Sequence, residues 1–136
     1  MNIEFQNNFT VMPKHTNYMY PMIFGGEFFS KIDLCAAACV RRALHDSECQ
    51  SAVTHMVNVK FLKPCYVGDL IYIKSNIVEA RTKSIKVKVI AEREKRDSDK
   101  RDVVAEGELV FVSVLDIQYV KDKPDKLPYA SHNLKL

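Results

Sequence analysis

The stretch FGGEFFSKIDLCAAACVRRAL, residues 24–44, contains the one clear helical pattern in the sequence. Its apolar residues recur every three or four positions, which predicts a helix from Gly26 to about Leu44. The apolar stripe is wide, so we expect the rest of the chain to enclose this helix. A glycine pair, Gly25 and Gly26, stands at its start, and Asp33 lies two turns inside it.

The rest of the chain alternates apolar and polar residues, which is typical of strands. Strands are expected near residues 3–11, 51–61, 70–80, 84–91 and 103–115. In the second of these, one face is expected to carry Val53, His55, Val57, Val59 and Phe61. One helix against an antiparallel sheet of about five strands is an α+β architecture. Sheet edges are usually paired or covered, so a dimer that continues the sheet is expected.

Length and composition indicate one soluble domain over residues 1–136, with a core at about 3–116 and a tail at 117–136. A net charge of +3 is too small to indicate nucleic-acid binding. No apolar stretch approaches the roughly 20 residues of a membrane span, and the N-terminus lacks a signal-peptide pattern. With four cysteines that look reduced, the expected location is cytoplasmic.

Two of these cysteines, Cys35 and Cys39, lie one helical turn apart in an alanine-rich run, which favours packing in the core. A zinc site made of Cys35, Cys39, His45 and Cys49 is the alternative. It lacks the tight Cys-x-x-Cys spacing of structural zinc sites, so no metal is expected.

The helix start and the acid behind it form the candidate site. Free N–H groups at a glycine-rich helix start can stabilise a developing oxyanion. Asp33 has apolar neighbours on the helix, and a carboxylate in such a place can deprotonate water or attack a carbonyl. Asn17 and His15 could hold water or substrate. The simpler alternatives are a turn at the glycines, an ion pair at Asp33 and loop hydrogen bonds at the other two.

Other reaction classes lack their motifs in this sequence. There is no Gly-x-Ser-x-Gly elbow, no phosphate-binding P-loop and no dinucleotide-binding Gly-x-Gly-x-x-Gly. A hydrolysis that depends on a carboxylate requires none of them. The sequence does not decide whether Asp33 acts as a nucleophile or as a general base.

The chain resembles the hotdog-fold acyl-CoA thioesterases, in particular the cytosolic acyl-CoA hydrolases. The resemblance runs from about His15 to Asp116 through motifs in the same order and spacing. These motifs are His15-Thr16-Asn17, Phe24-Gly25-Gly26 with Asp33, Phe61-Leu62-Lys63-Pro64, Val67-Gly68-Asp69, Ser84-Ile85-Lys86-Val87-Lys88-Val89 and Ala105-Glu106-Gly107 leading to Phe111-Val112.

This resemblance implies a thioester hydrolase whose active sites lie between the subunits of a dimer. Asp33 would be the base or nucleophile, and Gly26, with Gly25, would donate N–H groups to the thioester oxygen. Asn17 of the opposing subunit would position water or substrate. Dimers of this kind often assemble further into tetramers or hexamers, and no cofactor is implied beyond the CoA thioester itself.

The resemblance also implies a surface that binds the CoA part of the substrate. Lysine and arginine are suited to its phosphates. The implied substrate- and CoA-binding residues are His15, Phe24, Lys63, Pro64, Arg81, Thr82, Lys83 and Ser84.

Two other functions remain open. The segment 18–23 lacks the glycine that relatives have before Phe-Gly-Gly, which motivates a non-catalytic hotdog module that binds acyl-CoA or acyl carrier protein. A hotdog dehydratase or hydratase would require a catalytic histidine, for which His15 and His45 are poor candidates.

Overall fold

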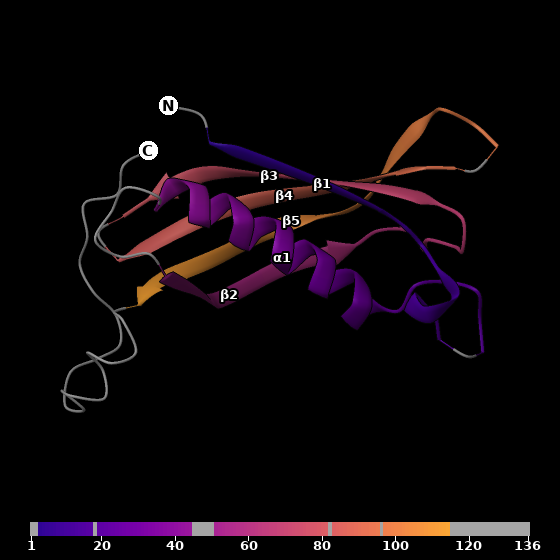
Figure 1. Cartoon of the computed structure of the whole chain (residues 1–136), viewed down its shortest axis with the longest axis horizontal. Coiled ribbons are helices and arrows are strands. Elements are labelled where there is room, and N and C mark those ends of the chain that lie inside the picture. Colours follow the sequence, from indigo (N-terminus) through magenta and orange to yellow (C-terminus); the bar gives the residue numbers. More distant parts are fainter. Residues whose placement is uncertain (1–2, 18, 45–50, 82, 96, 115–136) are drawn as a thin grey trace.

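The computed structural model describes residues 3–17, 19–44, 51–81, 83–95 and 97–114. A short strand and a 3₁₀ turn precede one long helix, and four strands follow it (Figure 1). The elements are β1 (Glu4–Thr10), η1 (Pro13–His15), α1 (Gly25–Ala43), β2 (Ser51–Phe61), β3 (Leu70–Ala80), β4 (Ser84–Glu94) and β5 (Arg101–Val114). This order agrees with the predicted one.

The five strands form one sheet in the order β1-β3-β4-β5-β2, and every neighbouring pair is antiparallel. The helix α1 lies across one face of this sheet (Figure 1). The predicted α+β hotdog architecture is therefore confirmed. Strands β1 and β2 are the two edges of the sheet.

The core lies between α1 and the face of the sheet that it covers. The helix contributes a buried stripe made of Phe28, Ile32, Cys35, Ala36, Cys39, Val40 and Ala43. The sheet meets it with side chains such as Ile73, Val87 and Leu109. Burial of each large aliphatic or aromatic side chain stabilises the fold by about 1.5–3 kcal/mol. The outer side of the helix is open, with Leu34 64% exposed, so the described chain encloses α1 on one side only.

A register shift in β2 changes which of its residues face the helix. Val53 pairs with Val112 of β5, whereas Val57 pairs with Leu109, and the shift falls between Thr54 and Met56. Positions 112 and 109 point to opposite faces of β5 because side chains alternate along a strand. The prediction that Val53 and Val57 share one face is therefore wrong, since one extra residue reverses the alternation.

The paired cysteines of α1 belong to the core, as predicted. The Cys35 thiol lies 3.4 Å from the Ser75 hydroxyl, and the Cys39 thiol donates to the main-chain oxygen of Ile3. Burial raises the pKa of both thiols, which keeps them protonated. The other two members of the zinc alternative, His45 and Cys49, lie outside the described residues. Across the described ranges, no cluster of three or more metal-binding side chains occurs.

The described part of the chain contains no helix long and apolar enough to cross a membrane.

Candidate active site

The first turn of α1 presents main-chain donors that no side chain of the described residues caps. Phe24 is the N-cap residue, and its side chain forms no capping hydrogen bond. The N–H groups of the first helical residues, Gly25, Gly26 and Glu27, have no acceptor within the helix because there is no preceding turn. A β-carbon added to Gly25 would meet no atom of the described residues within 4 Å. The helix start is therefore open to a ligand oxygen.

Backbone strain does not explain the two glycines, since Gly68 is the one described residue with a positive φ. At Gly26, an added β-carbon would lie 3.1 Å from a ring carbon of Phe24. Gly26 thus lets the Phe24 ring lie over the first turn. Close approach of the Phe24 ring therefore accounts for Gly26, whereas Gly25 leaves open space in front of the first turn.

A cavity of about 230 Å³ opens beside Gly25. Its lining comes from the helix start, the end of β2 and the loop that follows: Ile23, Gly25, Phe28, Phe61, Leu62, Lys63, Pro64 and Cys65. The rings of Phe28 and Phe61 are in contact at 5.4 Å between centroids and form the apolar floor. The structure therefore brings the predicted CoA-binding residues Lys63 and Pro64 to the predicted donors. Small-molecule sites usually have volumes of 300–1,000 Å³, and this cavity is smaller. The described chain therefore forms only part of a small-molecule site.

Asp33 lies on the same face of α1 as Gly26, seven residues farther along. Seven residues correspond to about 10 Å of helix axis. Its carboxylate oxygen Oδ1 accepts a hydrogen bond of 2.7 Å from the hydroxyl of Thr54 on β2. A hydroxyl donor of this kind fixes the rotamer of the carboxylate and orients its second oxygen.

Sequence reasoning missed Thr54. A threonine in an alternating strand is ordinary, and its orientation toward α1 depends on the register, which shifts directly after it. Counting the chain from Phe61 with a strict period of two places Thr54 on the outer face. The local signal that could have revealed it is the one-residue irregularity of β2, read together with the position of Asp33.

His15 and Asn17 lie in the segment that leads to the helix. The His15 ring is 5% exposed, its Nδ1 accepts from the Met12 N–H at 3.0 Å, and burial lowers its pKa. It therefore holds the 3₁₀ turn as a neutral ring. Asn17 is exposed, and its Oδ1 accepts from the Met19 N–H at 3.0 Å. Their roles toward substrate stay predictions.

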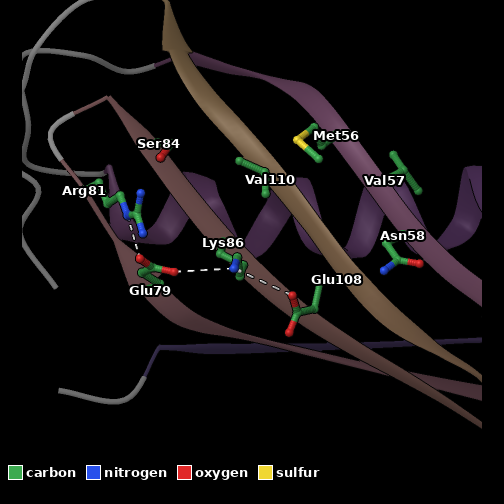
Figure 2. Close-up of a pocket in the computed structure, with 9 residues that line it drawn as sticks. All are labelled: Met56, Val57, Asn58, Glu79, Arg81, Ser84, Lys86, Glu108 and Val110. Atoms are coloured by element: carbon green, nitrogen blue, oxygen red, sulfur yellow. Dashed lines mark hydrogen bonds and ion pairs between the residues drawn. The ribbon is translucent and has the colours of Figure 1, made fainter.

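The other predicted CoA-binding residues lie at the opposite end of the sheet, in the turn between β3 and β4. Figure 2 shows Arg81 directed toward Glu79, with Nε 2.6 Å from its carboxylate, and Ser84 nearby. These residues line a depression of about 310 Å³ on the sheet face opposite α1. Lys83 is exposed in the same turn, and Thr82 lies outside the described residues.

The two ends of the sheet are far apart within one chain. Along β4, nine residues separate Ser84 from Arg93, which contacts Pro64, and this corresponds to about 30 Å. One described subunit therefore does not bring the turn at 81–84 to the cavity at the helix start.

Comparison with known proteins identifies the family. The model of the thioesterase superfamily matches residues 20–100, which include the helix start, Asp33 and the cavity. The chain belongs to the thioesterase superfamily.

Solved structures of this superfamily share the fold of the chain. An acyl-CoA hydrolase from Staphylococcus aureus, solved with butyryl-CoA, CoA and CoA disulfide, is 26% identical with a TM-score of 0.75, and the match covers 94% of this chain and 71% of that one. A hexameric broad-specificity acyl-CoA thioesterase is 28% identical with a TM-score of 0.72, covering 82% and 74%. A hexameric thioesterase from Yersinia pestis, 24% identical with a TM-score of 0.74, covers 92% of both chains and supports the fold. The predicted enzyme class, a thioester hydrolase, is confirmed at the level of this superfamily.

A protein of another enzyme class, an isomerase, also matches this chain. The methylthioribose-1-phosphate isomerase of Aquifex aeolicus is 32% identical over 108 residues, which are 79% of this chain. The chain spans about a fifth of that protein, 21% of its length. The greater part of the isomerase therefore has no counterpart in this thioesterase-superfamily chain.

Proposed function

We propose that this chain hydrolyses acyl-CoA thioesters to a free carboxylic acid and CoA. The observation that carries the proposal is the uncapped Gly25–Gly26 helix start, which opens beside Lys63 with Asp33 on the same helix face. The S. aureus acyl-CoA hydrolase supports it, and variants of that enzyme were solved with an asparagine, an aspartate or a threonine replaced by alanine. Asn17, Asp33 and Thr54 are the corresponding residue types in this site.

In the proposed reaction the thioester oxygen accepts a hydrogen bond from the Gly26 N–H, which stabilises the negative charge that develops during attack. Asp33 takes a proton from a water molecule, and the water oxygen bonds to the carbonyl carbon. The carbon–sulfur bond then breaks, and the proton on Asp33 passes to the departing thiolate. Water and one carboxylate are sufficient for this sequence, so we propose no metal or redox cofactor.

The helix spacing bears on the role of Asp33. About 10 Å of helix axis separates Gly26 from Asp33, and a side chain leans toward the helix start by a few ångströms. The remaining gap accommodates a carbonyl group and one water molecule. Direct attack by Asp33 instead requires the donors and the carboxylate to come from two subunits.

The proposed active unit is a homodimer joined along β2. This edge strand is 11 residues long and exposes Val53, Met56 and Val57. A long apolar edge is a template for pairing with another strand. The other edge, β1, is shorter and polar, and Arg42 donates to its Glu4 carbonyl at 2.6 Å. The hexameric state of the broad-specificity acyl-CoA thioesterase supports assembly beyond one chain.

Antiparallel pairing along β2 would also complete the CoA-binding surface. A two-fold axis reverses the partner, so the partner subunit's turn at residues 81–84 would approach this subunit's Lys63 and Pro64. The part-site of about 230 Å³ would then gain basic side chains for the phosphates of CoA. Location in the cytoplasm, where acyl-CoA substrates occur, is part of this proposal.

The decisive experiment measures thiol release from a panel of short, long, branched and aromatic acyl-CoAs. Asp33→Asn removes the base and keeps the shape of the side chain, so we expect kcat to fall by about 10²–10⁴-fold. Asp99→Asn is the matched control because Asp99 is an exposed carboxylate of the β4–β5 hairpin. Full activity of Asp33→Asn would contradict the mechanism.

Rapid-quench mass spectrometry separates the two roles of Asp33. Direct attack predicts a transient protein species heavier by the acyl group, whereas base catalysis predicts that only substrate and product are observed. The distance of about 10 Å along the helix favours base catalysis if the N–H donors and the carboxylate belong to one subunit.

A second candidate is a non-catalytic module that binds acyl-CoA. The hydrogen bond from the Met19 N–H to Asn17 Oδ1 favours it, because that amide oxygen is already engaged within its own loop. Tight binding of an acyl-CoA without any thiol release would support this candidate, and multiple turnovers would exclude it.

A further inference from the structure

Arg93, at the end of β4, is the most buried lysine or arginine among the described residues, at 6% exposure. It forms a two-point contact with Asp102 of β5, with Nε 3.1 Å from Oδ1 and Nη2 2.8 Å from Oδ2. Its Nη1 donates to the Pro64 carbonyl at 2.5 Å and lies 4.0 Å from Asp69. The planar guanidinium thus donates to Asp102 on one side and to Pro64 on the other. The single ammonium group of a lysine does not have this geometry.

These contacts hold a loop that we call the clamp loop, residues 62–69, against the end of the sheet. Asp102 also pairs with Lys63 at 3.0 Å, so Arg93 and Lys63 share one carboxylate. At the far end of the clamp loop, Asp69 accepts from the Tyr66 N–H at 2.8 Å. Arg93 therefore contacts both ends of the clamp loop, through the Pro64 carbonyl and the Asp69 carboxylate.

The clamp loop in turn holds the segment that enters α1. The Ile23 N–H donates to the Cys65 carbonyl at 2.9 Å, and the Val67 N–H donates to the Pro21 carbonyl at 2.9 Å. These two bonds lie on either side of Met22, which bridges to Tyr66. A displacement of Pro64 and Cys65 therefore moves Ile23, and the helix begins two residues later.

We propose that Arg93 is a positioning residue that sets the Gly25 and Gly26 N–H donors relative to the cavity through the clamp loop. The inference rests on the proposed function for its effect on turnover. It does not require Arg93 to touch the substrate, since its three hydrogen bonds are all within the protein.

The test compares two substitutions with a matched control. Arg93→Lys keeps the charge but has one donor head, which can meet Asp102 or Pro64 but not both. Asp102→Asn keeps the shape and removes the charge that Arg93 and Lys63 share. Lys74→Met is the control, because it breaks an exposed pair with Glu92 of similar length, 3.0 Å, away from the clamp loop.

Each protein is assayed for kcat and KM with an acyl-CoA and with the matching acyl-pantetheine, which lacks the nucleotide. Loosened oxyanion donors weaken transition-state binding, so for Arg93→Lys we expect kcat to fall about tenfold with both substrates. Lys74→Met is expected to match the wild type. A folded Arg93→Lys protein with unchanged kcat would overturn the inference. A rise in KM for acyl-CoA alone would also overturn it, since Arg93 would then act on nucleotide binding.

Hydrogen–deuterium exchange provides a readout that is independent of activity. Arg93→Lys and Asp102→Asn are expected to speed exchange at least fivefold in residues 21–28 and 62–69 while β3 and β4 stay protected. Uniformly faster exchange would indicate a general loss of stability and overturn the inference. If the wild type hydrolyses no acyl-CoA, the proposed function fails, whereas the exchange pattern still decides whether Arg93 positions the helix start.

Discussion

Gly107 is the position where the packing of β2 against β5 leaves no room for a side chain. A β-carbon at Gly107 would lie 2.1 Å from the Asn58 oxygen and 2.6 Å from the Val59 α-carbon. Carbon–oxygen contacts between strands are ordinarily about 3.3 Å or longer, so Gly107→Ala requires β2 to move by about 1.2 Å. The obstructing atoms are main chain, which cannot rotate away.

This displacement has a calculable effect on stability. Ladder hydrogen bonds of about 2.9 Å would lengthen beyond 4 Å, and losing two of them costs about 2 kcal/mol. Strain from the added methyl group contributes about 1 kcal/mol more. We therefore expect Gly107→Ala to lower the free energy of unfolding by about 3 kcal/mol and the Tm by about 10 °C.

Thermal unfolding followed by circular dichroism measures this effect, with Gly25→Ala as the control. The control adds the same methyl group at a position where no atom in the described part of the chain lies within 4 Å. A Tm for Gly107→Ala within about 2 °C of the wild type would contradict this prediction, because β2 would then leave room for a methyl group at position 107.

The remaining predictions concern the site and its support. Gly25→Ala should leave the Tm within about 2 °C and lower kcat/KM at least fivefold, since its methyl group faces the cavity; steady-state kinetics check this. Thr54→Val removes the hydroxyl that orients Asp33 and should lower kcat about tenfold, whereas Thr54→Ser should retain most activity in the same assay. Arg93 lowers the pKa of Asp102 from 3.8 to about 2, so this carboxylate stabilises the fold above pH 4 and the contribution is lost between pH 4 and pH 2. After allowance for solvent screening, it amounts to about 1 kcal/mol, and urea unfolding of Asp102→Asn across this range should show a flatter pH dependence than the wild type.

The elements of the fold could be predicted because their local patterns agree with the tertiary structure. The apolar spacing from Phe28 to Ala43 is the buried stripe of α1 itself. In β3 and β4, the apolar residues that alternate in the sequence are the ones buried on the sheet face that the helix covers. The error fell in β2, where an irregularity after Thr54 reverses the faces, so that strict alternation from Phe61 assigns Thr54 to the wrong one.

The candidate site was predictable in part, for a related reason. Gly25, Gly26 and Asp33 are close in sequence, so helical periodicity alone relates them. Thr54 meets Asp33 across 21 residues of chain, and Arg93 reaches Pro64 across 29, and neither contact follows from a local pattern. Long-range pairing depends on the strand order, which has β2 beside β5 rather than β3.

The main-chain donors at the helix start have a consequence for how this chain can change over evolutionary time. An N–H group is encoded by backbone conformation, so among the twenty residues only proline at that position deletes it. The surroundings of these N–H groups are side chains, such as Phe24, Phe61 and Leu62, which single mutations can replace. Substitutions of these side chains can therefore change substrate preference while the proposed donors to the carbonyl oxygen are retained.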